Sequence, residues 1–123
     1  MGQTIIVDFD GVINSYKTGW SGADVILDPP VSGAIEWLND MAIDFKIAIL
    51  SARSTQEGGI EAMKSYVLDN GVHTYFIENG DIFFPTEKVP SIMSIDDRGF
   101  RFNGTFPSKL EIDNFQPWHK DHV

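Results

Sequence analysis

Two short apolar runs, at residues 4–7 and 45–50, restrict the fold of this chain more than any other feature. Both are rich in aliphatic residues, and a polar residue follows each of them directly. A strand with one face in solvent would alternate apolar and polar residues, and neither run does so over its length. Such runs are typical of strands that are buried on both faces, as in a parallel sheet.

Helical and strand patterns alternate along the chain. The expected elements are, in order, a strand at 4–7, a helix over 31–41, a strand at 45–50, a helix over 60–68 closed by Asn70-Gly71, strands at 74–77 and 91–95, and a weaker strand at 100–102 with 105–106. Because each crossover must pack its helix back onto the sheet, this order predicts an α/β fold. We expect three layers, α/β/α, around a mainly parallel, Rossmann-like sheet of about five strands.

The length of 123 residues is usual for one domain, so residues 1–123 are expected to form a single unit. Within it, the polar, Gly-rich stretch 14–30 is expected to form a flap loop, and 107–123 a C-terminal tail in which Trp118 packs.

The formal net charge of −9 disfavours sequence-independent binding to long nucleic acid, because that affinity comes mainly from Lys and Arg. The chain has no cysteine, and its apolar runs are too short for a signal peptide or a membrane span. We therefore expect a cytoplasmic protein with no membrane contact. Its oligomeric state is left open by the sequence.

Polar side chains follow the expected strands at the points where the strands end. Asp8 and Asp10 follow the first strand, Ser51 and Arg53 the second, and the Asp96-Asp97 pair the fourth. The carboxyl ends of parallel strands meet at one edge of a sheet, which is where such sheets bind ligands. Carboxylates gathered there would repel one another, so a hard cation such as Mg²⁺ is expected between them.

These residues resemble, in the right order, the motifs of the haloacid dehalogenase (HAD) phosphatases. The segment Asp8-Phe9-Asp10-Gly11-Val12 looks like the first motif, D-x-D-G-[TV]. Ser51 in Ile49-Leu50-Ser51-Ala52-Arg53 resembles the second, Lys88 is a candidate for the third, and Ile95-Asp96-Asp97-Arg98 looks like the fourth. The resemblance runs from Thr4 to Phe106 and implies a hydrolase that acts on phosphoric monoesters.

The resemblance implies that Asp8 attacks phosphorus to form an aspartyl-phosphate. Asp10 would protonate the leaving oxygen and later activate the hydrolytic water, which favours phosphatase chemistry over dehalogenation. Mg²⁺ would be held by Asp8, the backbone carbonyl of Asp10 and Asp97, with Asp96 as a partner or alternate ligand.

The same resemblance assigns residues to the substrate. The Ser51 hydroxyl and the Lys88 ammonium would hold the phosphoryl oxygens, and Ala52 and Arg53 complete the expected substrate-binding set. Two of these assignments have alternatives. Lys88 lies outside any strong local pattern and competes with a solvated surface lysine, whereas Arg53 either binds the substrate phosphate or braces Asp96.

Each motif also has a plainer interpretation. Ser51 alone would suit a helix cap, and Asp96-Asp97-Arg98 alone would suit a turn with a surface ion pair. An EF-hand loop also begins like Asp8-Phe9-Asp10, but Val12, Ile13 and Gly19 occupy positions where that loop needs an oxygen ligand, Gly and Glu. The joint order of the motifs favours the enzyme.

No segment is long enough for the cap domain that larger HAD phosphatases place over small substrates. An uncapped site resembles the 3′-phosphatase domain of polynucleotide kinase-phosphatases and small phage-encoded relatives, so a nucleic-acid 3′-phosphate end is the narrower expectation. The kinase P-loop pattern G-x-x-x-x-G-K-[ST] does not occur in the sequence. Two alternatives stay open, a phosphatase for nucleotides or sugar phosphates and a non-catalytic binding module with the same fold.

Overall fold

A computed structural model describes residues 3–96, 100–101 and 103–114 of the chain. Two residues of the expected fourth motif, Asp97 and Arg98, lie outside this range. So does the tail from residue 115 onward, including Trp118, whose expected packing therefore stays a prediction.

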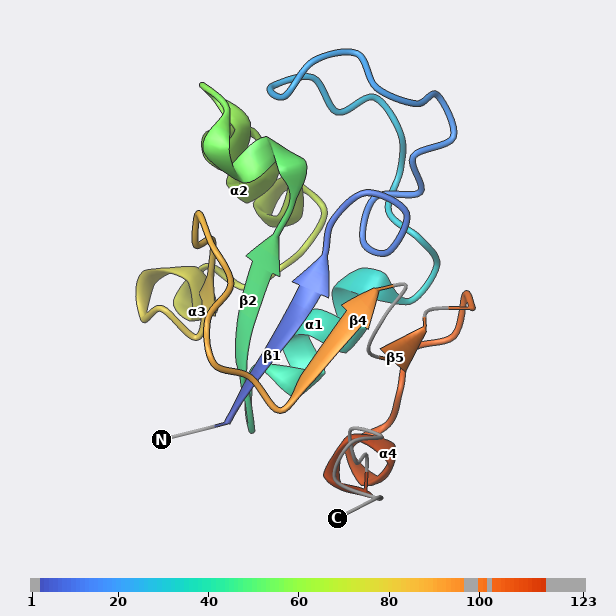
Figure 1. Cartoon of the computed structure of the whole chain (residues 1–123), viewed down its shortest axis with the longest axis vertical. Helices are drawn as coiled ribbons and strands as arrows, with labels where there is room; N and C mark the ends of the chain where they lie inside the picture. Colours follow the sequence, from blue (N-terminus) through green and yellow to red (C-terminus); the bar gives the residue numbers. More distant parts are fainter. Residues whose placement is uncertain (1–2, 97–99, 102, 115–123) are drawn as a thin grey trace.

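The sheet is parallel throughout, which confirms the predicted α/β class. Its strands are β1 (Thr4–Asp8), β2 (Lys46–Leu50), β3 (Ile82–Phe83), β4 (Met93–Asp96) and β5 (Phe100–Arg101). Their spatial order is β3-β2-β1-β4-β5, with β1 at the centre (Figure 1). Every pair of neighbouring strands is parallel, so the carboxyl ends of the strands lie along one edge.

Five helical segments accompany the sheet in the described part of the chain. They are α1 (Ala34–Met41), the short 3₁₀ helix η1 (Ala52–Thr55), α2 (Gly59–Asp69), α3 (Thr74–Glu78) and α4 (Lys109–Asn114). The helices predicted over 31–41 and 60–68 are confirmed as α1 and α2. None of the helices in the described ranges is long and apolar enough to cross a bilayer.

The strand predicted at 74–77 is wrong, because these residues form α3 instead. A short apolar run does not distinguish a strand from a helical turn, and only Phe76 of this helix is buried. The turn that ends the helix is built locally, since Asn79 Nδ2 donates to the Tyr75 carbonyl at 2.8 Å. The place beside β2 belongs to β3, whose Ile82 pairs with Ile47.

The core is formed on both faces of the central strands. Ile5, Ile6 and Val7 are consecutive on β1 and all are buried, so apolar side chains cover both sides of this strand. Ile49 on β2 and Ile95 on β4 are completely buried beside it. Each such side chain contributes about 1.5–3 kcal/mol. This packing fixes the position of β1 in the sheet, and with it the position of Asp8 at the carboxyl end of the strand.

The segment expected to be only a tail contains a packed helix. Ile112 of α4 is buried, and the chain leading into the helix is held by Trp37 of α1. The Trp37 indole stacks on Phe106 and donates from Nε1 to the Pro107 carbonyl at 2.7 Å. Residues 106–114 are therefore part of the folded unit.

The N-terminus of α2 approaches the chain at Arg53 more closely than any residue other than Gly would allow. A Cβ atom built on Gly59 would overlap the Arg53 carbonyl oxygen and come within 3.1 Å of the Arg53 Cβ atom. This contact fixes the backbone from which the Arg53 side chain extends.

We predict that Gly59→Ala destabilises the protein by about 1–3 kcal/mol, the usual cost of overpacking. The sign of the change is informative, because Ala favours a helix over Gly by about 1 kcal/mol where nothing clashes. The free energy of unfolding is measured by urea denaturation, with Ser65→Ala on the exposed side of α2 as the control. A stabilised Gly59→Ala protein would contradict the close approach.

Candidate active site

The polar residues predicted to meet at one edge of the sheet come from neighbouring strands. Asp8 pairs with Leu50, the residue before Ser51. Val7 pairs with Ile95, so Asp8 and Asp96 are the next residues on two adjacent parallel strands. At a strand spacing of about 4.8 Å, these two carboxylates project from the same face at the same height. The described part of the fourth motif therefore lies beside the expected nucleophile.

The chain turns sharply after Asp8. The Phe9 carbonyl accepts hydrogen bonds from the backbone amides of Val12, Ile13 and Asn14, and Gly11 adopts a positive φ of 85° that Gly adopts without strain. Asp8 Oδ1 accepts the Phe9 amide at 2.8 Å. This turn brings Asp10 back toward the sheet instead of letting it continue the strand.

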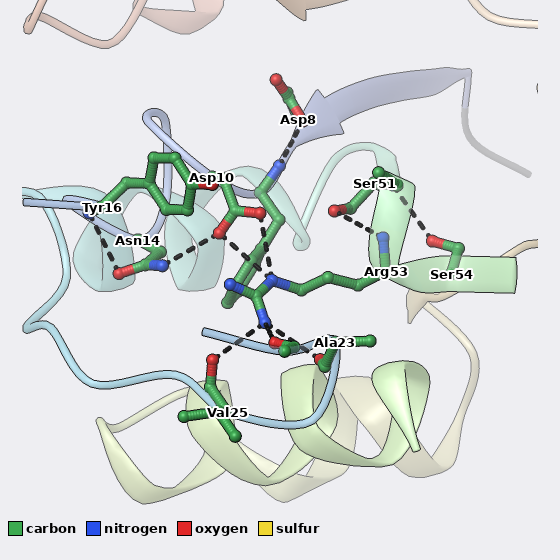
Figure 2. Close-up of polar contacts among 12 residues, drawn as sticks. Asp8, Asp10, Asn14, Tyr16, Ala23, Val25, Ser51, Arg53 and Ser54 are labelled. Atoms are coloured by element: carbon green, nitrogen blue, oxygen red, sulfur yellow. Dashed lines mark hydrogen bonds and ion pairs between the residues drawn. The ribbon is translucent and has the colours of Figure 1, made fainter. Parts of the chain in front are cut away.

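The Asp10 carboxylate is held from two sides. Asn14 Nδ2 donates to Oδ1 at 2.9 Å, and Arg53 Nε donates to Oδ2 at 3.0 Å and to Oδ1 at 3.2 Å (Figure 2). Asn14 is itself buried, and its Oδ1 accepts the Tyr16 amide. A carboxylate has about four lone-pair sites, two on each oxygen. Among the described residues, Oδ1 accepts two hydrogen bonds and Oδ2 accepts one. One lone-pair site on Oδ2 is therefore left for proton transfer.

Arg53 joins three segments of the chain at one point. Besides its ion pair with Asp10, its Nη1 atom donates to the carbonyls of Gly22, Ala23 and Val25 at 2.8, 2.9 and 3.0 Å. Its side chain is only 1% exposed. Figure 2 shows Ala23 and Val25 on the flap segment facing the guanidinium. The guanidinium thus ties the end of β2 to the first motif and to the flap.

This position corrects the two roles expected for Arg53. Its ion pair is with Asp10, which neither expectation named, and not with Asp96. A side chain that is 1% exposed and already donates to a carboxylate and a set of carbonyls does not face an incoming phosphate. The geometry supports a positioning role for Arg53 in place of direct substrate binding.

Ser51 caps the short helix η1. Its Oγ accepts the Arg53 amide at 3.1 Å, while its own amide donates to Ser54 Oγ at 3.0 Å, which completes a capping box. The cap interpretation of Ser51 is therefore confirmed. It is compatible with the phosphate role, because the cap uses Oγ as an acceptor and leaves its hydrogen to donate. Ala52, the first residue of η1, is exposed.

Lys88 lies in the connection between β3 and β4. It is exposed, and no hydrogen bond or ion pair joins it to another described residue. The structure brings Asp8, Asp10, Ser51 and Asp96 to the sheet edge from neighbouring segments, but it does not tie Lys88 to them. Its assignment to the third motif stays a prediction.

The loop 14–30 is anchored along its length. Thr18 donates from its amide and its hydroxyl to Asp28 at 2.8 and 2.6 Å, and these hydrogen bonds lower the pKa of Asp28. Tyr66 on α2 donates its hydroxyl to the Asp28 carbonyl at 2.9 Å, and burial raises the pKa of Tyr66 to about 12. Together with Arg53, these contacts hold the flap in one position.

The donor set at the sheet edge suits Mg²⁺. Asp8 and Asp96 supply carboxylate oxygens at adjacent strand ends, and Asp10 adds a backbone carbonyl. Oxygen donors of this kind are what Mg²⁺ prefers, with waters completing the shell. Asp97 falls outside the described range, and within that range no group of three or more His, Asp or Glu side chains is close enough to hold an ion.

Comparison with known proteins identified no related protein. The chain matches no family model, no curated protein and no solved structure. The HAD resemblance therefore rests on the motifs and on their placement at the sheet edge.

Asn14 and the flap carbonyls were not anticipated from the sequence. Asn14 lies four residues after Asp10, a spacing at which an Asx side chain can reach back across a tight turn. That local signal could have been found. The contacts of Arg53 with residues 22–25 span about 30 positions of sequence and carry no local pattern.

We predict that Arg53→Met lowers the free energy of unfolding by about 3 kcal/mol or more, because it leaves the Asp10 carboxylate and the flap carbonyls without their donor. Urea denaturation measures the change. The matched control is Lys46→Met, which removes a partly exposed ion pair with Asp81 and should cost less than about 1 kcal/mol. Equal losses in the two variants would contradict the central position of Arg53.

Proposed function

We propose that this protein is a Mg²⁺-dependent phosphomonoester hydrolase of the HAD type, with Asp8 as its nucleophile. The observation that carries the proposal is the fixed Asp10 carboxylate, two residues beyond Asp8 at the carboxyl edge of a parallel sheet. The Arg53 ion pair also holds the flap, and a binding module would use it for that alone. A hydrolase that forms an acyl phosphate on Asp8 needs an acid and base within reach of the leaving oxygen and of the hydrolytic water, and we assign that role to Asp10.

In the proposed reaction, an Asp8 carboxylate oxygen attacks phosphorus and the bond to the leaving oxygen breaks. Asp10 gives its proton to that oxygen through Oδ2, and in the second step it takes a proton from the water that hydrolyses the aspartyl-phosphate. Arg53 and Asn14 keep the Asp10 carboxylate oriented through both steps. Because they occupy three of its lone-pair sites, the orientation does not depend on substrate.

The phosphoryl oxygens would be held by the Ser51 hydroxyl and by Lys88. Ser51 is fixed by the cap of η1, so its free donor direction is set before substrate arrives. When bound by Asp8, the Asp10 carbonyl and Asp96 or Asp97, Mg²⁺ would neutralise charge between the anionic nucleophile and the anionic phosphoryl group.

The proposal includes the layers of the fold and the lack of a cap domain. Burial on both faces of β1 supports a three-layer, Rossmann-like HAD core of five strands without a cap domain. An anchored flap in place of a cap favours a substrate whose phosphate stands at an exposed end, and a nucleic-acid 3′-phosphate is the narrower choice. A nucleotide or sugar phosphatase is the second candidate. The absence of cysteine keeps the cytoplasm as the proposed location.

We predict that Asp8→Asn lowers phosphate release from an aryl phosphate by at least about 1,000-fold, since the nucleophile is removed. Chelation of the metal should abolish wild-type turnover, and added Mg²⁺ should restore it. Asp44→Asn, a change at an exposed turn before β2, serves as the control and should keep full activity. Wild-type protein that releases no phosphate from any aryl, nucleotide or 3′-phosphorylated substrate would support the binding module instead.

The role of Asp10 is tested by leaving groups of different basicity. In a single turnover, Asp10→Asn should slow release of the alcohol from an alkyl phosphate by about 100-fold or more, whereas release of the phenol from an aryl phosphate, whose leaving oxygen needs no proton, should slow much less. The amide keeps an oxygen for Arg53 and Asn14, and circular dichroism checks that the variant folds. The same loss in this first step on both substrates would show that Asp10 does not act as the acid.

A further inference from the structure

Trp20 lies on the flap directly above the residue that positions Asp10. The centre of its indole ring is 4.8 Å from Arg53 Cζ, within the range of a cation–π contact. Arg53 Nε is in turn 3.0 Å from Asp10 Oδ2. One guanidinium group therefore separates the indole from the expected catalytic carboxylate.

The ring is both fixed and accessible. Arg53 holds the flap backbone just after Trp20 through the carbonyls of residues 22, 23 and 25, and the Thr18–Asp28 hydrogen bonds close the loop around it. Nevertheless 45% of Trp20 remains exposed, whereas Trp37 in the core is 7% exposed. A large aromatic side chain that packs on a guanidinium and keeps nearly half of its surface in solvent suits a platform for a flat ligand.

From this arrangement we infer that Trp20 stacks on the nucleobase of the substrate and makes the site selective for nucleotides over sugar phosphates. The inference rests on the proposed function and names its substrate class. A nucleotide joins a flat aromatic group to a phosphate across one sugar, which matches an indole beside a phosphate-transfer site. Sugar phosphates offer no such ring.

Stacking also resolves the conflict between nucleic-acid chemistry and an acidic protein. A net charge of −9 disfavours binding through a run of backbone phosphates. A nucleobase is uncharged, and stacking on an aromatic side chain is worth about 1–3 kcal/mol per base without any added cation. One terminal base and one phosphate are then enough for recognition.

The test compares two oligonucleotides that end in a 3′-phosphate and differ only in whether the terminal sugar carries its base. Wild-type protein should show a KM about 5- to 150-fold lower for the end with the base, from the same stacking energies. Trp20→Ala should lose this preference, so that its KM is the same for the two ends, and Trp20→Phe should keep part of it. Tyr75→Ala, at another exposed aromatic residue, is the control and should behave as wild type.

Failure of this inference is distinguishable from failure of the proposed function. Equal KM values for the two ends in an active wild-type enzyme would overturn the role of Trp20 and leave the phosphatase intact. If no substrate is hydrolysed, binding of a nucleoside 3′-phosphate is measured by calorimetry against deoxyribose 3-phosphate. Tighter binding of the nucleoside that is lost in Trp20→Ala would still support stacking, and equal binding of the two would overturn it.

Discussion

The buried ion pair between Arg53 and Asp10 is the contact on which the rest of the site depends. Charges of this kind are costly to bury, so a guanidinium that is 1% exposed must have its donors satisfied. The acceptors for these donors come from two other parts of the chain. They are the Asp10 carboxylate and three carbonyls of the flap. Meeting that requirement fixes the geometry of both segments.

The same contact explains how an uncapped site can be ordered before substrate binds. The backbone at Arg53 is set by the Ser51 cap on one side and by the close approach of Gly59 on the other. From this fixed point the side chain reaches Asp10 and, through its stacking on Trp20, the outer surface of the flap. The positions of the proposed acid, the proposed phosphate ligand and the proposed base platform are thus coupled.

Much of the sheet could be predicted because doubly buried strands have a strong local signature. The strands at 4–7 and 45–50, the helices at 31–41 and 60–68 and the meeting of Asp8 with Asp96 all follow from such patterns. The run 74–77 was mispredicted because so short a run of mainly apolar residues fits a helical turn equally well. The partner of Arg53 depended on how the turn at Gly11 redirects Asp10, which is a tertiary outcome that residue order does not reveal.

The most direct test of the account is to trap the covalent intermediate. The wild-type chain is mixed with a phosphorylated substrate and Mg²⁺, quenched in acid and reduced with borohydride, and the modified peptide is located by mass spectrometry. Homoserine at position 8, the reduction product of an aspartyl-phosphate on Asp8, is the predicted result, and it should be absent from Asp8→Asn. Steady turnover with no modification at Asp8, or with the modification at Asp10, would contradict the mechanism.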